Sequence, residues 1–332
     1  MLYFSGHLHT FNQNVQKEDR IMNLYKPEGL LISSHENHEY ISSRQGLERA
    51  LERQAIIEAP VSLCDHDFNL HISLPGKLRA VMPRGEVQYF PDSREVKDIA
   101  VLTRVGKPIC FKVMGFERSA AGEDIAIVSR RAAQRECYLN YVSDLTPGDI
   151  IPARITHLES FGAFVDIGCG IISLLSIDCI SVSRISHPSA RLSVGDSIFS
   201  VIKSIDRDGR IYVTQRELLG SWEENAALFS EGQTVRGIIR SVESYGVFVE
   251  LKPNLAGLAE YREDARVGHT AAVYIKSIIP EKMKIKLIII DSHDAPRFAE
   301  PLEYFVDTDR ITHIDSWKYS PKDSPKVIES VF

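Results

Sequence analysis

The chain has 332 residues, more than one hydrophobic core usually supports, so we expect at least two domains. Its 44% hydrophobic and 25% charged residues are typical of a folded globular protein and exclude wholesale disorder. No apolar run reaches the roughly 18 residues that a membrane span needs. The first residues also lack the basic start and apolar stretch of a secretory signal. These features predict a cytoplasmic protein with no membrane partner.

The formal net charge of -6 disfavours a protein that grips duplex DNA through a large basic surface. The charge is uneven, however, because residues 231–290 carry nine basic and seven acidic side chains. A mildly basic third unit inside an acidic chain is compatible with phosphate contacts. The five cysteines are an odd number without a CxxC pair, which indicates reduced, mostly buried thiols rather than disulfides.

Motifs that would indicate an enzyme are absent. The sequence has no GxxxxGK[ST], HExxH or GxSxG, so we predict no catalytic residue and no cofactor. Runs such as Asp65-His66-Asp67 lack a compact, complete set of ligands, so we predict no metal site.

The first 55 residues precede the repeated part of the chain. Residues 1–21 are polar and without pattern, and we interpret them as an unstructured extension. Residues 22–55 are predicted to form an N-terminal helical segment. Its apolar residues follow helical spacing from Asn37 to Gln54, and Ser34 is the expected N-cap.

Residues 56–142 are interpreted as a degenerate first repeat that ends in a linker helix. The turn Val105-Gly106-Lys107 and the strand patterns after it match Val194-Gly195-Asp196 and its sequel in the next repeat. The front half of this first repeat has no counterpart of the tetrapeptide FGAF found later. We therefore expect the first repeat to dock a protein partner rather than RNA.

Two better copies follow, at residues 143–228 and 229–292. The strings IIPARITHLESFGAFVDIG and TVRGIIRSVESYGVFVELK share one register, with Gly162 and Gly246 placed 84 residues apart. A linker helix is expected within residues 216–229, between the two copies. Self-similarity of this kind indicates repeated domains of one architecture.

Each copy has five short strands rich in Val, Ile, Phe and Tyr, bounded by Gly, Pro and Asp turns. The pair Asp208-Gly209 predicts a hairpin with a type I′ turn, which needs positive φ at both residues. Closure of such a small sheet removes its exposed edges. The predicted fold class is all-β: tandem five-stranded OB-fold barrels joined by short helices, after an N-terminal helical segment. Residues 293–332 form a tail with the strand-like pieces EYFVD and ITHIDSW, placed on the last barrel.

The strings PGDIIPARITHLESFGAFVDIG, VGDSIFSVIKSIDRDGRIYVTQRE and EGQTVRGIIRSVESYGVFVEL resemble the RNA-binding repeat of the bacterial small-subunit ribosomal protein S-one family. That repeat is an OB-fold. The resemblance is close over residues 147–290 and weaker over the first repeat. It implies non-catalytic binding of single-stranded RNA, mRNA in translation, by aromatic stacking on one barrel face. The small ribosomal subunit is the partner that it implies.

The resemblance also assigns residues. Carried over position by position, the family's RNA-binding residues fall on Phe161, Phe164, Asp206, Arg210, Tyr245, Phe248 and Lys284. Pro280 takes the acidic position in the third repeat. The His that follows the third strand in many members is Ser176 in one copy and Glu260 in the other.

The spacing of Phe161 and Phe164 limits how the two rings can form one binding face. Phe161 and Phe164 would face opposite sides of a regular strand, so they share a face only if the chain bends, which Gly162 permits. An aromatic platform contributes about 1–3 kcal/mol per stacked base. Arg210 would stack or contact phosphate, and Asp206 would orient Arg210 or accept a hydrogen bond from a base edge. Alternatively, the two would form a turn-flanking ion pair of little energy.

Two other hypotheses stay open. Barrels that have lost RNA binding would leave a ribosome-associated scaffold for protein interactions, which the missing His and Pro280 allow. An RNA-processing enzyme would need a catalytic domain, for which the chain offers no candidate.

Overall fold

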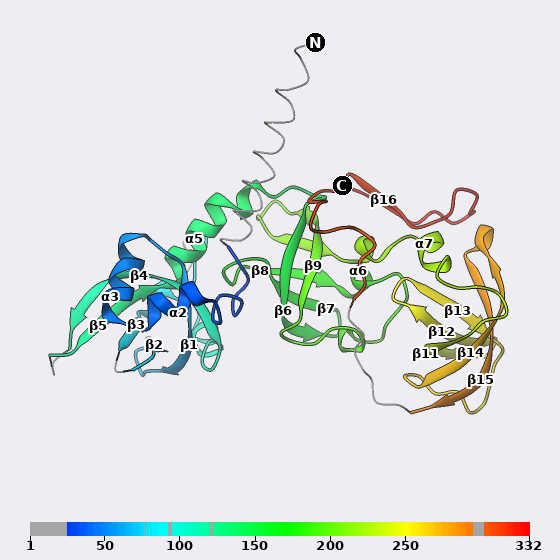
Figure 1. Ribbon diagram of the computed structural model, residues 1–332, viewed down its shortest axis with the longest axis horizontal. Helices are drawn as coiled ribbons and strands as arrows, with labels where there is room; N and C mark the ends of the chain where they lie inside the picture. The colour runs from blue at the N-terminus through cyan, green and yellow to red at the C-terminus, as the bar shows by residue number, and fades with distance from the viewer. Residues whose placement is uncertain (1–24, 77, 92–94, 120–121, 295–301) are drawn as a thin grey trace, which may run out of the picture. The chain divides into compact units, whose positions relative to one another are not determined.

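The described residues hold three closed five-stranded barrels, numbered here in chain order, and a two-stranded sheet near the C-terminus (Figure 1). The expected all-β class with short linking helices is therefore confirmed. The chain divides into two compact units, one with barrel 1 and residues 166–172, the other with the rest of barrel 2, barrel 3 and the tail. The computed structural model describes residues 25–76, 78–91, 95–119, 122–294 and 302–332; the predicted extension 1–21 lies outside them.

Two short helices precede barrel 1, where the sequence predicted one helix from Asn37 to Gln54. Ser34 caps the first helix as expected, since its side chain accepts a hydrogen bond from the Asn37 N–H. Ser43 then accepts a hydrogen bond from the Gly46 N–H and starts a second helix. A hydroxyl that satisfies a free first-turn amide favours a new helix start, which explains the break. The helices are α2 (His35–Ile41) and α3 (Arg44–Glu52).

Barrel 1 pairs its strands in the order β1-β2-β3-β5-β4. Side chains alternate along them, so that Leu70 and Ile72 are buried while His71 and Ser73 point outward. The strands are β1 (Ile57–Cys64), β2 (Leu70–Ser73), β3 (Arg79–Met82), β4 (Pro108–Arg118) and β5 (Asp124–Ser129). The helical pieces are η1 (Arg84–Glu86), α4 (Asp98–Leu102), α5 (Arg130–Asn140) and η2 (Val142–Asp144).

Barrel 2 has the order β10-β8-β7-β6-β9, and β8 and β10 pair in parallel. This places the third and fifth strands of the repeat side by side. The strands are β6 (Ile150–Glu159), β7 (Gly162–Asp166), β8 (Ile172–Ser176), β9 (Ser197–Ile205) and β10 (Ile211–Thr214). The helical pieces are α6 (Ile177–Ile180) and η3 (Pro188–Ala190).

The hairpin between β9 and β10 turns at the predicted place, but the predicted type I′ turn is wrong. Gly209 has a positive φ of 74°, whereas Asp208 is not among the residues with positive φ. The loop is instead closed by Asp206, whose carboxylate accepts hydrogen bonds from the N–H groups of Asp208 and Arg210, both at 2.9 Å. A carboxylate that satisfies the turn amides removes the need for two left-handed residues.

The linker after barrel 2 is also divided, because Gly220 adopts φ 80° and ends the first piece. Ser221 and Glu224 then form a reciprocal capping box that starts the second. Barrel 3 follows with the order β11-β12-β13-β15-β14. The linker pieces are η4 (Arg216–Leu219) and α7 (Trp222–Ala226). Barrel 3 comprises β11 (Thr234–Glu243), β12 (Gly246–Lys252), β13 (Leu255–Ala259), β14 (Thr270–Ile279), η5 (Pro280–Lys282) and β15 (Lys284–His293).

Barrels 2 and 3 are joined by a buried ion cluster. The Glu250 carboxylate accepts two hydrogen bonds from Arg191 of barrel 2, at 3.1 and 2.8 Å. It accepts two more from Arg240 of barrel 3, both at 2.9 Å. Burial opposes ionisation of this carboxyl, but the two guanidinium groups hold the pKa of Glu250 below its ordinary value. The cluster therefore links barrel 2 to barrel 3, because the Glu250 carboxylate is the shared counter-charge of both guanidinium groups.

Asn254 makes a second connection between these barrels. Its side-chain oxygen accepts a hydrogen bond from the Val182 N–H at 2.9 Å, and its amide donates to the carbonyls of Arg216 and Gly220, both at 2.8 Å. The Tyr319 hydroxyl of the tail donates to the Asn254 backbone carbonyl at 2.6 Å. A turn of barrel 3 thus satisfies polar groups of barrel 2, the linker and the tail.

The tail contacts barrels 2 and 3, whereas the sequence placed it on the last barrel alone. The Tyr304 hydroxyl accepts a hydrogen bond from the Phe199 N–H of barrel 2, and the Tyr304 ring packs edge-on against the Phe199 ring. Trp317 and Tyr319 pack on the core of barrel 3. The predicted strand EYFVD is not a strand, and the paired strands are β16 (Ser316–Lys318) and β17 (Glu329–Val331).

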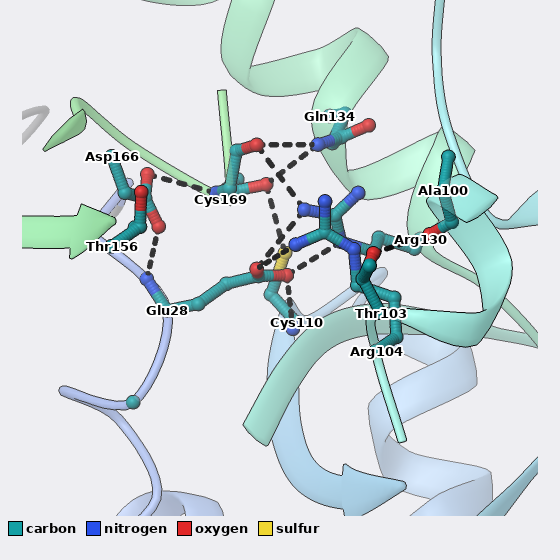
Figure 2. A network of polar contacts seen from close by, with 12 residues as sticks. Glu28, Ala100, Thr103, Arg104, Cys110, Arg130, Gln134, Thr156, Asp166 and Cys169 are labelled. Atoms are coloured by element: carbon teal, nitrogen blue, oxygen red, sulfur yellow. Dashed lines mark hydrogen bonds and ion pairs between the residues drawn. The ribbon is translucent and has the colours of Figure 1, made fainter. Parts of the chain in front are cut away.

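A buried polar network holds the N-terminal segment and residues 166–172 against barrel 1 (Figure 2). The Arg130 side chain, fully buried, donates to both carboxylate oxygens of Glu28 at 2.6 and 3.0 Å and to the Gly170 carbonyl at 3.2 Å. The Glu28 N–H in turn donates to Asp166 at 2.7 Å. Burial and the charge of Glu28 raise the pKa of Asp166 to about 7.

All five cysteines are unpaired, as the sequence predicted, and four of them are buried. Within the described residues, no helix has both the length and the apolar character needed to cross a membrane.

Candidate nucleic-acid interface

Phe161 and Phe164 lie together at the start of β7. Their ring centroids are 6.1 Å apart and the rings meet edge to face, so the two side chains share one face as predicted. Phe161 is 53% exposed and Phe164 is half-buried. Gly162 makes the arrangement possible because a Cβ there would lie 2.4 Å from the Leu175 carbonyl oxygen of the next strand. An exposed ring supported by a second ring is a surface on which a base can stack.

His157 extends this aromatic cluster, and the sequence did not identify it. Its ring lies 6.4 Å from the Phe164 ring at an interplanar angle of 25°, a stacked arrangement. The His157 side chain is 62% exposed, and its Nε2 lies 2.8 Å from the Glu159 carboxylate. The sequence signal that could have identified His157 is its position four residues before Phe161, which places it on the preceding strand, β6.

Barrel 3 repeats the pair of rings. Tyr245 and Phe248 have centroids 6.1 Å apart at 86°, nearly the geometry seen in barrel 2. Tyr245 is 68% exposed. Val247 pairs with Ala259, and continuation of this antiparallel register brings Tyr245 opposite the exposed Tyr261. Both barrels therefore present an exposed ring beside a half-buried ring.

A row of outward-facing residues crosses three strands of each barrel, and we call it the outer row. In barrel 3, Phe248 pairs with Leu258 and Leu258 with Lys286. In barrel 2, Leu174 pairs with Tyr212. By the 84-residue repeat, Phe164 corresponds to Phe248 and Leu174 to Leu258. The outer rows are Phe164, Leu174 and Tyr212 in barrel 2, and Phe248, Leu258 and Lys286 in barrel 3.

Tyr212 and Lys286 were not predicted as site residues. Both lie on the last strand of their barrel. Tyr212 follows the predicted residue Arg210 by two positions, and Lys286 follows the predicted residue Lys284 by two positions. Because side chains alternate along a strand, residues two apart share a face, which is the signal that would have found them. Tyr212 is half-buried and Lys286 is exposed.

The proposed partnership of Asp206 with Arg210 takes a different form in the structure. Asp206 closes the hairpin loop through backbone amides, as described above. The Arg210 guanidinium lies 3.7 Å from Asp208, with both side chains largely exposed. The expected turn-flanking ion pair thus involves Asp208 rather than Asp206, because the Asp206 carboxylate is occupied by the N–H groups of the turn.

Lys284 is exposed at the start of β15. Within the described part of the chain, neither Lys284 nor Lys286 forms an ion pair, so both ammonium groups face solvent. Pro280, at the position of Asp206, is the first residue of η5 and offers no carboxylate to this hairpin. The two barrels therefore present similar rings but different charges.

Barrel 1 has no Phe, Tyr or Trp in its outer row, and its one ring there is the imidazole of His71. His71 pairs with Val81, and Val81 pairs with Ile127. His71 is held by Asp65, 3.1 Å from its Nε2. Beside this row Leu63 is 48% exposed. The face that carries rings in barrels 2 and 3 is mainly aliphatic in barrel 1, which agrees with a degenerate repeat.

Comparison with known proteins supports a nucleic-acid function for the middle of the chain. The family model described as S1 RNA binding domain matches residues 144–215, which cover barrel 2. The small ribosomal subunit protein bS1 of Staphylococcus saprophyticus is 33% identical over 143 residues, 41% of this chain and 36% of that protein. The bS1 protein of Staphylococcus aureus (strain COL) is 28% identical over 275 residues, 80% of this chain and 66% of that protein.

The chain covers less than two thirds of either bS1 protein. A solved structure from Streptococcus pneumoniae, a multidomain protein with nucleic acid binding domains, is 13% identical and covers 71% of this chain and 73% of that chain. The TM-score of this alignment is 0.24. The chain thus contains an S1 RNA-binding domain and is distantly related to bS1.

Proposed function

We propose that this protein binds single-stranded RNA without catalysis, by stacking bases on the exposed rings of barrels 2 and 3. The observation that carries the proposal is the pair of matching ring arrangements, Phe161 with Phe164 and Tyr245 with Phe248, each at 6.1 Å with the outer ring exposed. The two barrels thus expose large rings at equivalent positions of the repeat. Stacking suits them because every base has a π-face.

The predicted residues contribute unequally to this function. The four rings supply stacking, and Arg210 and Lys284 supply positive charge at the edge of the same faces. Asp206 supports the hairpin that carries Arg210, since its carboxylate holds the turn amides. His157 and Tyr212 complete the face of barrel 2.

The test is fluorescence anisotropy with a labelled, unstructured RNA. Phe161→Ala removes a ring that is half exposed, so the fold should survive. We expect its affinity to fall about tenfold, the loss of one stacked base at about 1.4 kcal/mol. Leu139→Ala, 47% exposed on α5, is the matched control and should bind like the wild type. Equal binding by Phe161→Ala, or a wild type that fails to bind at micromolar concentration, would refute stacking at this face.

The wider assignment is part of the same proposal. We place the protein in the cytoplasm, in translation, with mRNA as the RNA and the small ribosomal subunit as its partner. The chain's distant relation to bS1 supports this placement. Barrel 1 would make the protein contact, since its outer row of His71, Val81 and Ile127 presents apolar surface instead of rings.

A ribosome-associated scaffold without RNA binding is the second candidate, and the aliphatic outer row of barrel 1 favours it. Cosedimentation with small ribosomal subunits separates the two. A scaffold would sediment equally with and without Phe161→Ala and would lose binding with Leu63→Asp. An RNA-binding protein held by mRNA would lose sedimentation in Phe161→Ala or after nuclease treatment.

A further inference from the structure

The last hairpin differs in charge between barrels 2 and 3. In barrel 2 it carries Asp206, Arg207, Asp208 and Arg210, so that two bases are balanced by two acids. In barrel 3 the corresponding stretch, Pro280 to Lys286, contains three lysines and only Glu281 as an acid. The first hairpin is neutral and the second carries a net charge of +2.

The outer row of barrel 3 is also more positively charged than that of barrel 2. Tyr212 pairs with Leu174 in barrel 2, and Lys286 pairs with Leu258 at the equivalent place in barrel 3. A ring at the end of one row is therefore a cation at the end of the other. Lys284 faces the same side two residues earlier and is exposed. Strand β15 thus presents two ammonium groups in line, one strand beyond Leu258 in the row that begins at Phe248.

The arginine and lysine side chains near barrel 3 fall into two groups. Arg240 is committed to Glu250, Arg262 to Asp264 and Lys252 to Glu303. Across the described residues, Lys284 and Lys286 have no carboxylate within 4.0 Å, and the same holds for Arg236, Lys276 and Lys282. Of these five cations, Lys284 and Lys286 are the two on the last strand, β15. In barrel 2, Lys203 contacts the Cys179 sulfur and Arg210 lies 3.7 Å from Asp208, which leaves Arg207 as the hairpin cation without an ion pair among the described residues. Cations without a counter-charge are those that gain most from a phosphate.

We infer that barrel 3 holds the phosphate backbone of the RNA strand through Lys284 and Lys286, while barrel 2 holds its bases through the longer aromatic face of His157, Phe161, Phe164 and Tyr212. This inference rests on the proposed function. It divides the site into a salt-sensitive part and a salt-insensitive part. Counterion release makes phosphate contacts depend on salt, with a slope of about 0.7 in log K against log salt per contact on a single strand. Stacking has no such dependence.

The experiment measures RNA affinity of the full chain by anisotropy between about 50 and 300 mM KCl. Lys284→Gln/Lys286→Gln keeps a polar side chain at both positions, each one bond shorter, and removes two charges. We expect its salt slope to be smaller than that of the wild type by about 1.4, two contacts, and its affinity to fall severalfold at low salt. Lys318→Gln/Lys322→Gln, two exposed lysines of the tail, makes the same change in net charge and should leave the slope unchanged.

Tyr212→Leu tests the other part. We expect it to weaken binding at every salt concentration with the wild-type slope, because it removes stacking surface and no charge. Equal slopes for the two double-lysine variants would overturn the inference while leaving RNA binding intact. Failure of the wild type to bind would instead overturn the proposed function. Loss of slope in the tail variant alone would assign the phosphate contacts to the tail and also overturn the inference.

Discussion

Gly162 is the residue on which the ring arrangement of barrel 2 depends. It lies where strands β7 and β8 approach so closely that a Cβ would be 2.4 Å from the Leu175 carbonyl oxygen. A backbone atom cannot move aside as a flexible side chain can. The exposed side chain of Phe161 therefore directly precedes a position where β7 and β8 leave no room for a side chain.

Gly162→Ala should destabilise the protein by about 1–3 kcal/mol, because the added methyl group forces the two strands apart. Urea denaturation measures this. Gly115→Ala is the control, since Gly115 also lies in a strand but has no atom within 4 Å of the added Cβ and no positive φ. It should be neutral or stabilising by about 0.4–1 kcal/mol. Equal effects of the two substitutions would mean that the close approach at Gly162 is not limiting.

At the scale of elements, the segment before α2 is fixed by one carboxyl group. Glu58 on β1 accepts hydrogen bonds from the N–H groups of Gly29, Leu31 and Ile32, at 2.9 to 3.0 Å. Burial raises the pKa of Glu58 to about 7, the charge of Glu28 adds to the rise, and the three N–H groups oppose it. The folded segment therefore favours the protonated acid at this position.

This pKa predicts how stability depends on pH. The folded value lies above the ordinary value of 4.5, so the stability that Glu58 contributes is fully present below pH 4.5 and is lost as pH rises through 7. Thermal unfolding should show lower stability at pH 7.5 than at pH 5. Glu58→Gln cannot ionise, so its dependence on pH over this interval should be weaker by up to about 3 kcal/mol. Asp166 shifts in the same direction and remains in the variant, so part of the slope persists. An unchanged slope would contradict the assignment to Glu58.

The elements also show what local sequence could and could not predict. The barrels could be predicted from the alternation of buried and exposed side chains along the strands and from the repeated turn residues. Both signals are local in sequence. The helix break at Ser43 depended on one hydroxyl that accepts from Gly46, and the turn at Asp208-Gly209 on a carboxylate two residues earlier. Such side-chain bonds compete with the backbone preferences on which the predictions rested.

Only the site residues that the repeated sequence marks were predicted. The rings at positions 161, 164, 245 and 248 were found because the repeat and the family resemblance marked them. Tyr212 and Lys286 could have been found from their two-residue spacing to Arg210 and Lys284. His157 was missed because its contact with Phe164 depends on how β6 and β7 lie against each other, which sequence separation does not reveal. The same holds for Arg191 and Glu250, which are 59 residues apart.

At the scale of the whole molecule, barrels 2 and 3 share their stability. Arg191, Arg240 and Glu250 are almost fully buried, and removal of the carboxylate would leave two guanidinium groups without a counter-charge. Breaking a buried pair in this way costs about 3–5 kcal/mol. The two tryptophans of the chain, Trp222 and Trp317, both pack on the core of barrel 3. Tryptophan fluorescence therefore reports chiefly the unfolding of barrel 3 and the tail.

This arrangement allows the coupling between the barrels to be measured. Gly162→Ala destabilises barrel 2, whereas both tryptophans pack on the core of barrel 3. The substitution should therefore shift the fluorescence transition in urea only if the two barrels unfold together. We expect that shift in the otherwise wild-type chain and its loss when Glu250→Gln is present, because the ion cluster transmits the effect. Glu243→Gln, an exposed acid on β11, is the control and should preserve the shift. A double-mutant cycle gives the coupling energy, since sites in independent domains would add. Additivity of Gly162→Ala and Glu250→Gln would mean that barrels 2 and 3 fold as separate domains, and that the RNA strand would meet two faces without a fixed spacing.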